Sequence, residues 1–117
     1  MRYFALDFET GNASPLSACA LGVSIFEDGR LVGERVSLLK PPACAGKFHW
    51  GNVRVNHIKE NMVQDAPSFA SFWRELAPLA EGSVLVAHNA MFDTGVLCAC
   101  LSHYGVEKFI RSDKGLS

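Results

Sequence analysis

Short apolar runs separated by turn residues fill the first third of the chain. The run from Tyr3 to Phe8 is continuous and rich in aromatic residues, which is typical of a central strand buried on both faces. Further runs cover Ala18 to Glu27 and Arg30 to Leu39, and Pro41-Pro42 ends the second of these. Between them, Asp28-Gly29 predicts a hairpin turn, because this pair tolerates the positive φ that a type I′ turn needs. The pattern predicts an antiparallel three-strand meander.

Beyond the meander the chain changes to a helical period. As far as Gln64 no period is sustained, so this segment is predicted to be a loop with one or two short helical turns. After Pro67, with Ser68 as N-cap, apolar residues recur at helical spacing. They are Phe69, Phe72, Trp73, Leu76 and Ala80. Pro78 predicts a kink or an early end of this helix, and Gly82 closes it.

A fourth strand and a last helix complete the pattern. Ser83 to Ala87 is predicted to be a strand, and Asn89 can cap a helix that runs to about Tyr104, before Gly105. A strand-helix-strand connection favours a right-handed crossover, which places the fourth strand parallel to and beside the first. We therefore predict one α/β domain whose mixed sheet is an antiparallel three-strand meander plus a parallel fourth strand, with helices.

Two acidic motifs far apart in the sequence end the first and fourth strands. They are Asp7 and Glu9 in ALDFETGN, and Asp93 in VLVAHNAMFD. Ligand sites gather at the carboxyl ends of parallel strands, so the topology brings the motifs together. Asp7 and Glu9 point to one face with about 7 Å between their Cα atoms, and a divalent cation offsets their repulsion. Such hard oxygen ligands suit Mg²⁺ or Mn²⁺. Two such ions about 4 Å apart can activate a water and stabilise the leaving oxygen of a phosphodiester.

Composition narrows the class of protein. The chain has 117 residues, 49% of them apolar and 20% charged, which is ordinary for one small globular domain. Its net charge of −1 leaves no basic stripe of the kind that grips duplex DNA, so a phosphate partner would need bound cations. The cysteines are single or spaced C-x-C and no secretory start precedes them, which indicates a cytoplasmic protein with reduced thiols. The apolar runs are too short for a membrane helix, so no membrane association is expected.

The acidic motifs and the segment between them resemble a known family. DFET, then KENMVQDAPSFASFWRELAP, then AHNAMFD occur in the order found in DEDD-family 3′–5′ exonucleases of the DNA polymerase III epsilon-subunit type. The resemblance covers nearly the whole chain. It implies a ribonuclease H-like fold, a site for two Mg²⁺ or Mn²⁺ ions, and stepwise hydrolysis from a single-stranded or frayed 3′ end of DNA or RNA. It also implies a DNA polymerase as a possible partner.

The resemblance carries roles onto matching positions of this sequence. It implies that Asp7, Glu9 and Asp93 are catalytic metal ligands. It further implies that Thr10 and Phe92 contact the terminal nucleotide and that Asn89 supports the second motif.

The family's third motif does not follow Asp93 in this sequence. That motif, His-x4-Asp or a Tyr-based version, lies on a helix after a further strand, whereas the His88 and Asp93 pair already belongs to the second motif. We therefore expect residues 1–117 to form a single, C-terminally incomplete exonuclease domain that lacks the C-terminal strand and helix. Without the acid of that motif we expect weaker metal binding. Without its general base we expect the rate of hydrolysis to be lower by a factor of about 10² to 10⁴. An uncovered sheet face beside Tyr3 and Ala5 predicts self-association or marginal stability.

A second departure lies in VNHIKENMV, where family members usually have His-Gly-Ile. Aligned without a gap, Asn56 takes the histidine position and His57 takes the glycine. A shift of one residue instead gives His57 the histidine position and a contact with the nucleotide. Both alignments remain open at this point.

Several candidates have a purely structural alternative. His88 at the end of an apolar strand is expected to be a hydrogen-bonded packing histidine. Phe92 lies at helical spacing from the apolar face and can equally be core or a stacking group. Cys98 and Cys100 lie on different faces of a helix and are expected to be core thiols rather than zinc ligands.

Two aromatic residues of the loop region also allow two interpretations. Phe48 and Trp50, flanked by Lys47 and Arg54, can form a stacking platform for a single strand. More often such residues anchor a loop on the sheet, and that is the expectation here. At the level of the whole chain, the alternative to an exonuclease is a catalytically silent nuclease-like module that binds single-stranded nucleic acid or a polymerase.

Overall fold

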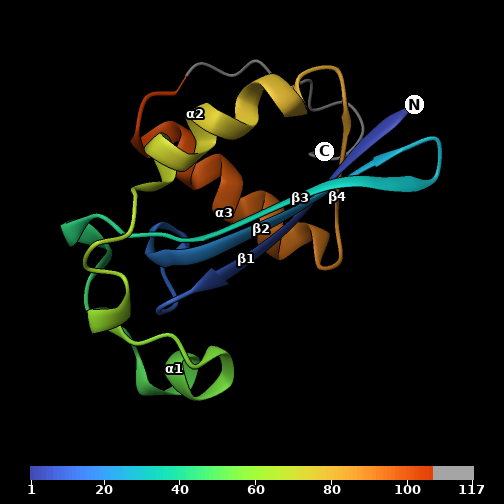
Figure 1. The fold of residues 1–117 in the computed structure, drawn as a ribbon. Helices are drawn as coiled ribbons and strands as arrows, with labels where there is room; N and C mark the ends of the chain where they lie inside the picture. The colour runs from blue at the N-terminus through green and yellow to red at the C-terminus, as the bar shows by residue number, and fades with distance from the viewer. Residues whose placement is uncertain (107–117) are drawn as a thin grey trace.

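A four-stranded mixed sheet forms the centre of the molecule. The computed structural model describes residues 1–106. Its strands are β1 (Arg2–Thr10), β2 (Ala18–Glu27), β3 (Arg30–Leu38) and β4 (Val84–Ala87). Their order is β3-β2-β1-β4, in which β2 is antiparallel to both β1 and β3, and β4 is parallel to β1 (Figure 1). The predicted meander and the parallel fourth strand are confirmed.

The hairpin between β2 and β3 has the predicted turn. Glu27 pairs with Arg30 across a two-residue loop, and Asp28 and Gly29 have φ of 51° and 83°. Positive φ at both central residues is the property of a type I′ turn, which matches the twist of the strands.

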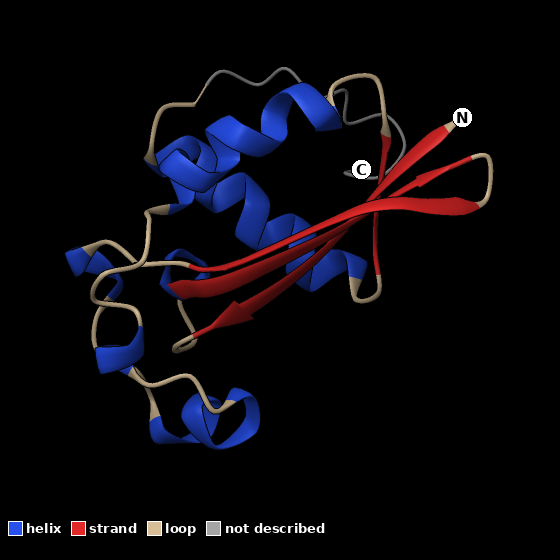
Figure 2. Ribbon diagram, viewed as in Figure 1, coloured by secondary structure: helices blue, strands red, loops and turns tan. Residues whose placement is uncertain are grey.

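Two helices cover one face of the sheet. They are α2 (Phe69–Ala80) and α3 (Ala90–His103), and both lie on the same side of the strands (Figure 2). Alternate residues Phe4, Leu6 and Phe8 of β1 face them and are buried. The largest fully buried side chain is that of Trp73, which contacts Phe4 edge-on at 6.4 Å between ring centroids. Full burial of a large apolar side chain contributes about 1.5–3 kcal/mol, so this layer is the main core.

The ends of these helices differ in part from the prediction. Ser68 caps α2 by accepting a hydrogen bond from Ser71 N at 3.1 Å, as expected. The early end at Pro78 is wrong, because α2 continues to Ala80. Pro78 lies in the last turn, where the loss of one backbone donor removes little of the helical ladder. After α3, Gly105 has φ of 63° and ends the helix where predicted.

The segment between β3 and α2 forms a small lobe of short helices. It contains 3-10 turns at Ala43–Ala45 and Glu60–Met62 and the helix α1 (Trp50–Asn56), which confirms the predicted short helical turns; another 3-10 turn, Pro15–Ser17, precedes β2. In Figure 1 α1 lies beyond the carboxyl end of β1, away from α2 and α3. Cys19, Ile58 and Val63 form a second small core under this lobe.

The opposite face of the sheet is open over much of its area. Within residues 1–106, α2 and α3 cover only the other face. The open face contains a hollow of about 560 Å³, floored by small residues such as Ala5, Gly22 and Ser24. Val36, 80% exposed, lies on its rim. The predicted exposure of this face is confirmed, although charged Glu34 and Arg35 also line the hollow.

No helix in the described part of the chain is both long and apolar enough to cross a membrane.

We expect the chain to self-associate through this open face. Val36→Lys places a charge on the apolar surface and should shift the chain toward monomer in sedimentation velocity, since burial of an unpaired ammonium is costly. Val55→Lys is the matched control, because Val55 is 79% exposed but lies on α1. Wild-type chain that sediments as a monomer at all concentrations would contradict the expectation.

Candidate active site

The two acidic motifs meet where β1 extends beyond the end of β4. Pairing between these strands ends at Leu6 and Ala87, so the later residues of β1 have no partner in β4. Asp93, in the first turn of α3, fills this gap: its Oδ1 accepts a hydrogen bond from Phe8 N at 2.9 Å. The Asp93 side chain is 2% exposed. The structure thus brings Asp93 directly to the backbone between Asp7 and Glu9.

Asp7 and Glu9 lie on the face of β1 opposite the helices. Asp7 is exposed and lines the hollow of the open face, whereas Glu9 is half-buried beside the lobe. A β-bulge follows Glu9, where the register with β2 shifts before Thr10. Asp93 reaches the edge of the sheet at Phe8 N, and its charge acts on Glu9. Across residues 1–106, no group of three or more His, Cys, Asp or Glu side chains is arranged to hold a metal ion.

Neighbouring carboxylate charges nevertheless perturb Glu9 and Asp93. The pKa of Glu9 is raised, first by burial, then by the charges of Asp7 and Asp93. Burial also raises the pKa of Asp93, and Asp7 adds to the rise, while the Phe8 N–H and the His88 side chain oppose it. The cluster therefore holds more negative charge than its surroundings balance.

The chemistry of this donor set fits a hard divalent cation. Carboxylate oxygens are the ligands that Mg²⁺ and Mn²⁺ prefer, and a cation would offset the repulsion that adds to the effect of burial on both pKa values. Mg²⁺ commonly takes one or two carboxylates and completes its shell with water and phosphate oxygens. Asp7, Glu9 and Asp93 could supply such a partial shell.

Thr10 and Phe92 lie together on an open groove of about 330 Å³ beside the carboxylates. Thr10 is buried at the end of β1, and Asn52 of α1 and Gly95 of α3 also line the groove. Phe92 is 39% exposed, so its ring is not core. The groove opens at the end of β1, next to the acidic residues.

Asn89 and His88 differ from their expected contacts. Asn89 occupies the N-cap position of α3, but its side chain makes no capping hydrogen bond; its carbonyl accepts from Asp93 N at 3.0 Å. Its support of the motif is therefore through the backbone. His88 is exposed and lines the hollow of the open face with Asp7, so the expected packing role is wrong. β4 ends at Ala87 as predicted, and His88 lies just beyond it on the open face, where Val86 of the same strand is also exposed.

Two asparagines of α1 hold the lobe against β1: Asn56, which the sequence offered for the family's histidine position, and Asn52, which was not singled out from the sequence. Asn52 Nδ2 and Asn56 Nδ2 both donate to the Thr10 carbonyl, at 3.1 and 3.0 Å. Asn56 Oδ1 in addition accepts from Ile58 N at 2.9 Å. The available signal was their spacing, since residues four apart share one helix face.

His57 does not share these contacts. It is the exposed C-cap of α1 and has φ of 63°, in the left-handed region that glycine prefers. A glycine-like backbone at position 57 favours the gap-free alignment, in which Asn56 takes the family's histidine position.

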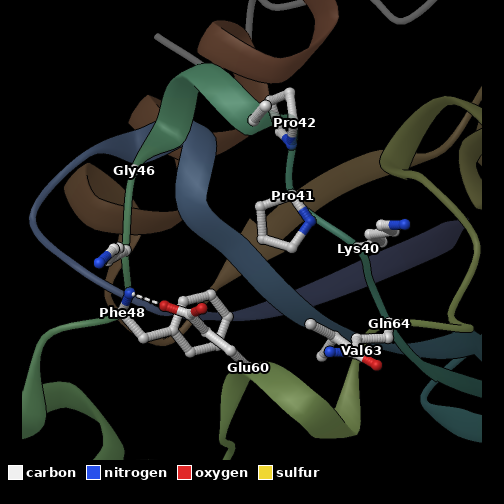
Figure 3. A pocket seen from close by; sticks show the side chains of 10 residues that line it. Lys40, Pro41, Pro42, Gly46, Phe48, Glu60, Val63 and Gln64 are labelled. Atoms are coloured by element: carbon white, nitrogen blue, oxygen red, sulfur yellow. Dashed lines mark hydrogen bonds between the residues drawn. The ribbon is translucent and has the colours of Figure 1, made fainter.

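The two lobe aromatics behave differently. Phe48 anchors the lobe as expected: a Cβ added at Gly11 would lie 2.5 Å from its ring, and its N–H donates to Glu60 Oε2 at 2.5 Å (Figure 3). The pocket drawn there, of about 330 Å³, has Glu60 as its one carboxylate. Trp50 is 69% exposed, so the anchoring role is wrong for it.

All four cysteines are free thiols. Cys100 is buried as expected, which raises the pKa of its thiol to about 12, but Cys98 is exposed on the opposite side of α3. The prediction of a core thiol is therefore right for Cys100 and wrong for Cys98.

Comparison with solved structures defines the class of fold. Exonuclease I superposes with a TM-score of 0.75 over 86% of this chain and 24% of its own, at 16% identity. The E. coli exonuclease I complex with an oligonucleotide gives a TM-score of 0.74 at the same identity. The fold is the ribonuclease H-like α/β arrangement of exonucleases.

The chain belongs to the exonuclease family, whose model matches residues 4–111. It is 41% identical over 49 residues to a Treponema pallidum DNA polymerase III subunit epsilon, covering 42% of this chain and 23% of that protein. It is 37% identical over 86 residues to a Rhodobacter capsulatus DNA polymerase III subunit epsilon-like protein, covering 74% and 12%. The chain thus spans less than a quarter of the length of these relatives.

We expect His57→Gly to stabilise the fold by about 0.5–1 kcal/mol, because it removes the cost of a left-handed β-carbon and part of this gain is lost to unfolded-chain entropy. Urea unfolding measures the change. Arg54→Gly, inside α1, is the contrasting control and should destabilise by about 1 kcal/mol. Equal destabilisation by both substitutions would show that position 57 has no glycine-like backbone.

Proposed function

We propose that the chain carries the active site of a 3′–5′ exonuclease that hydrolyses phosphodiester bonds from a single-stranded or frayed 3′ end. The observation that carries the proposal is the contact of Asp93 with Phe8 N, between Asp7 and Glu9, in a member of the exonuclease family. That contact gathers negative charge at one end of the sheet, beside a groove of nucleotide-sized volume.

In this proposal Asp7, Glu9 and Asp93 hold two Mg²⁺ or Mn²⁺ ions. When bound, such ions activate a water and stabilise the leaving oxygen of the phosphodiester. Thr10 and Phe92 line the groove for the terminal nucleotide, Phe92 through the exposed part of its ring. Asn89 holds the start of α3 through its carbonyl.

Asn56 rather than His57 is assigned to the α1 side of the site. Its amide fixes the Thr10 carbonyl, one residue after Glu9, so it acts as a positioning residue for the end of β1. The exposed His57 ends α1 in a left-handed backbone conformation.

A second candidate function is a silent module that binds single-stranded nucleic acid or a polymerase without hydrolysis. It is favoured by the finding that the carboxylates of residues 1–106 do not form a metal-holding group of three or more. The stretch in which the third motif was sought includes residues 107–117, which lie outside the described residues. Under this second candidate function, the carboxylate cluster is the remnant of an active site that no longer hydrolyses nucleic acid.

The names of relatives and neighbours support the partners proposed. Relatives are named as DNA polymerase III subunits, and exonuclease I has been solved with an oligonucleotide. We propose a single-stranded nucleic acid as substrate and a DNA polymerase as partner. A cytoplasmic location agrees with four unpaired thiols.

Metal-dependent release of nucleotides tests the first candidate. With Mn²⁺, the wild-type chain should release mononucleotides from a 3′-labelled single strand, and Asp7→Asn should slow release by at least about 100-fold, because it removes a preorganised charge from the site. Asp65→Asn, an exposed acid on the lobe, is the control and should retain full activity. No release by wild type at high enzyme concentration would favour the silent module.

Thermal stability should follow the charge of the cluster. The pKa values of Glu9 and Asp93 are raised on folding, so the folded state binds more protons than the unfolded state and their contribution to stability is lost as pH rises through the raised values. Asp7→Asn weakens this repulsion. The melting temperature of the variant should therefore rise relative to that of wild type as the pH increases from about 4 to 7.

Mn²⁺ at neutral pH should reverse that order. At ten times its Kd the ion stabilises wild type by about 1.4 kcal/mol, while Asp7→Asn gains much less. Equal stabilisation of both chains by Mn²⁺ would argue against binding at this cluster.

A further inference from the structure

Trp50 is the most unusual exposed residue near the proposed site. Large aromatic side chains are usually buried, and the only other tryptophan, Trp73, is 1% exposed. Trp50 opens α1, and the preceding His49 is fixed to the end of β1, where His49 N donates to the Gly11 carbonyl at 2.8 Å. An exposed indole thus lies on an element docked to the strand that carries Asp7 and Glu9.

The indole is held in place rather than free. Its ring stacks on the His49 imidazole, with 5.4 Å between centroids and 28° between planes. The imidazole is itself fixed, because its Nδ1 accepts a hydrogen bond from Gly51 N at 3.0 Å. One face of the indole therefore rests on a fixed ring, and exposure leaves the other available. A preorganised aromatic face loses little conformational entropy when a flat ligand stacks on it.

The face of α1 that carries Trp50 points away from β1. Asn52 and Asn56 donate to Thr10 and so define the inner face. Successive helical residues are about 100° apart, so Trp50 lies about 200° from Asn52, while Arg54 lies one turn from Trp50 on the same side. The exposed Arg54 side chain thus lies on the same outer face of α1 as the indole.

The lobe is also the basic part of a chain with net charge −1. From position 47 to 59 the sequence contains Lys47, Arg54 and Lys59, together with His49 and His57, and no acidic residue. An exposed aromatic ring within positive charge is the arrangement by which proteins bind single strands, through base stacking and phosphate attraction. This charge complementarity indicates nucleic acid rather than an apolar protein segment as the ligand.

We infer that the outer face of α1 is a stacking platform for single-stranded nucleic acid, with a base on Trp50 and a neighbouring phosphate on Arg54. The inference extends the proposed function, because the strand would run from the groove of Thr10 and Phe92 across α1. A helix with its side chains is about 10–12 Å wide and stacked bases rise about 3.4 Å, so the base on Trp50 is about three nucleotides from the 3′ end. The platform binds the strand on the 5′ side of the bond to be cut.

Tryptophan fluorescence tests this inference on the full 117-residue chain, with the oligonucleotide dT8 as probe and EDTA present. Because Trp73 is buried, any quenching by dT8 reports Trp50. We expect dT8 to quench wild type, and Trp50→Ala to abolish the quenching and weaken binding by about 5- to 150-fold in fluorescence anisotropy of labelled dT8. Trp50→Phe, which retains an aromatic face, should recover most of the affinity.

Two controls separate stacking from other effects. Val55→Ala removes a 79% exposed apolar side chain from the same helix and should leave the affinity within twofold of wild type. Arg54→Gln should lower the slope of log affinity against log salt by about 0.7, the value for one phosphate contact on a single strand. Circular dichroism melting establishes that each variant is folded.

Binding without quenching, or equal binding by Trp50→Ala and wild type, would overturn the platform and leave the exonuclease proposal standing. Quenching and loss of affinity in a chain that hydrolyses nothing with Mn²⁺ would support the platform and overturn the exonuclease instead. Absence of any dT8 binding would overturn the platform, while release of nucleotides with Mn²⁺ decides the exonuclease proposal separately.

Discussion

The hydrogen bond from Phe8 N to Asp93 Oδ1 joins the two halves of the site. It is buried, 2.9 Å long and spans 85 residues of sequence. A hydrogen bond to a charged acceptor contributes about 1.5–3 kcal/mol, and a buried N–H left without a partner costs about 1–3 kcal/mol. Because β4 stops at Ala87, no strand could satisfy this donor, and the first turn of α3 does so instead. One carboxylate therefore completes the sheet edge and delivers charge to the site.

This contact explains why the cluster is electrostatically unfavourable without a cation. Holding Asp93 beside β1 fixes its charge near Asp7 and Glu9, and burial withholds from Asp93 and partly from Glu9 the water that would screen their charges. The repulsion among these carboxylates lowers the stability of the fold locally and concentrates negative charge at this end of the sheet. Such an arrangement is common at functional sites, where perturbed carboxylates are tuned by a bound ion. The lobe adds the complementary feature, a basic and aromatic surface docked to the same strand end.

The sequence predicted the elements whose signals are local or periodic. Alternation and turn chemistry gave the meander and its type I′ turn, and the crossover rule gave the parallel β4. The lobe was not predictable in detail, because its structure depends on contacts across the chain: Asn56 with the Thr10 carbonyl, and Phe48 against Gly11.

Single-residue environments were the least predictable part. His88 and Cys98 each lie beside an apolar position, and a shift of one residue at a strand end or on a helix face decides between burial and exposure. The dual role of Asp93 has no local signature either, because its acceptor bond reaches a backbone donor in another strand. The acidic motifs predicted proximity, and the tertiary structure determines how the carboxylates are oriented.

Amide hydrogen exchange at Phe8, followed by NMR in the folded chain, measures the central contact most directly. Wild type should protect this amide, and Asp93→Asn should retain the protection because its side-chain oxygen still accepts the bond. Asp93→Ala should exchange about 10- to 100-fold faster, in line with the loss of a charge-assisted hydrogen bond. Rapid exchange in wild type, or equal protection in Asp93→Ala, would contradict the joining of the two motifs through this bond.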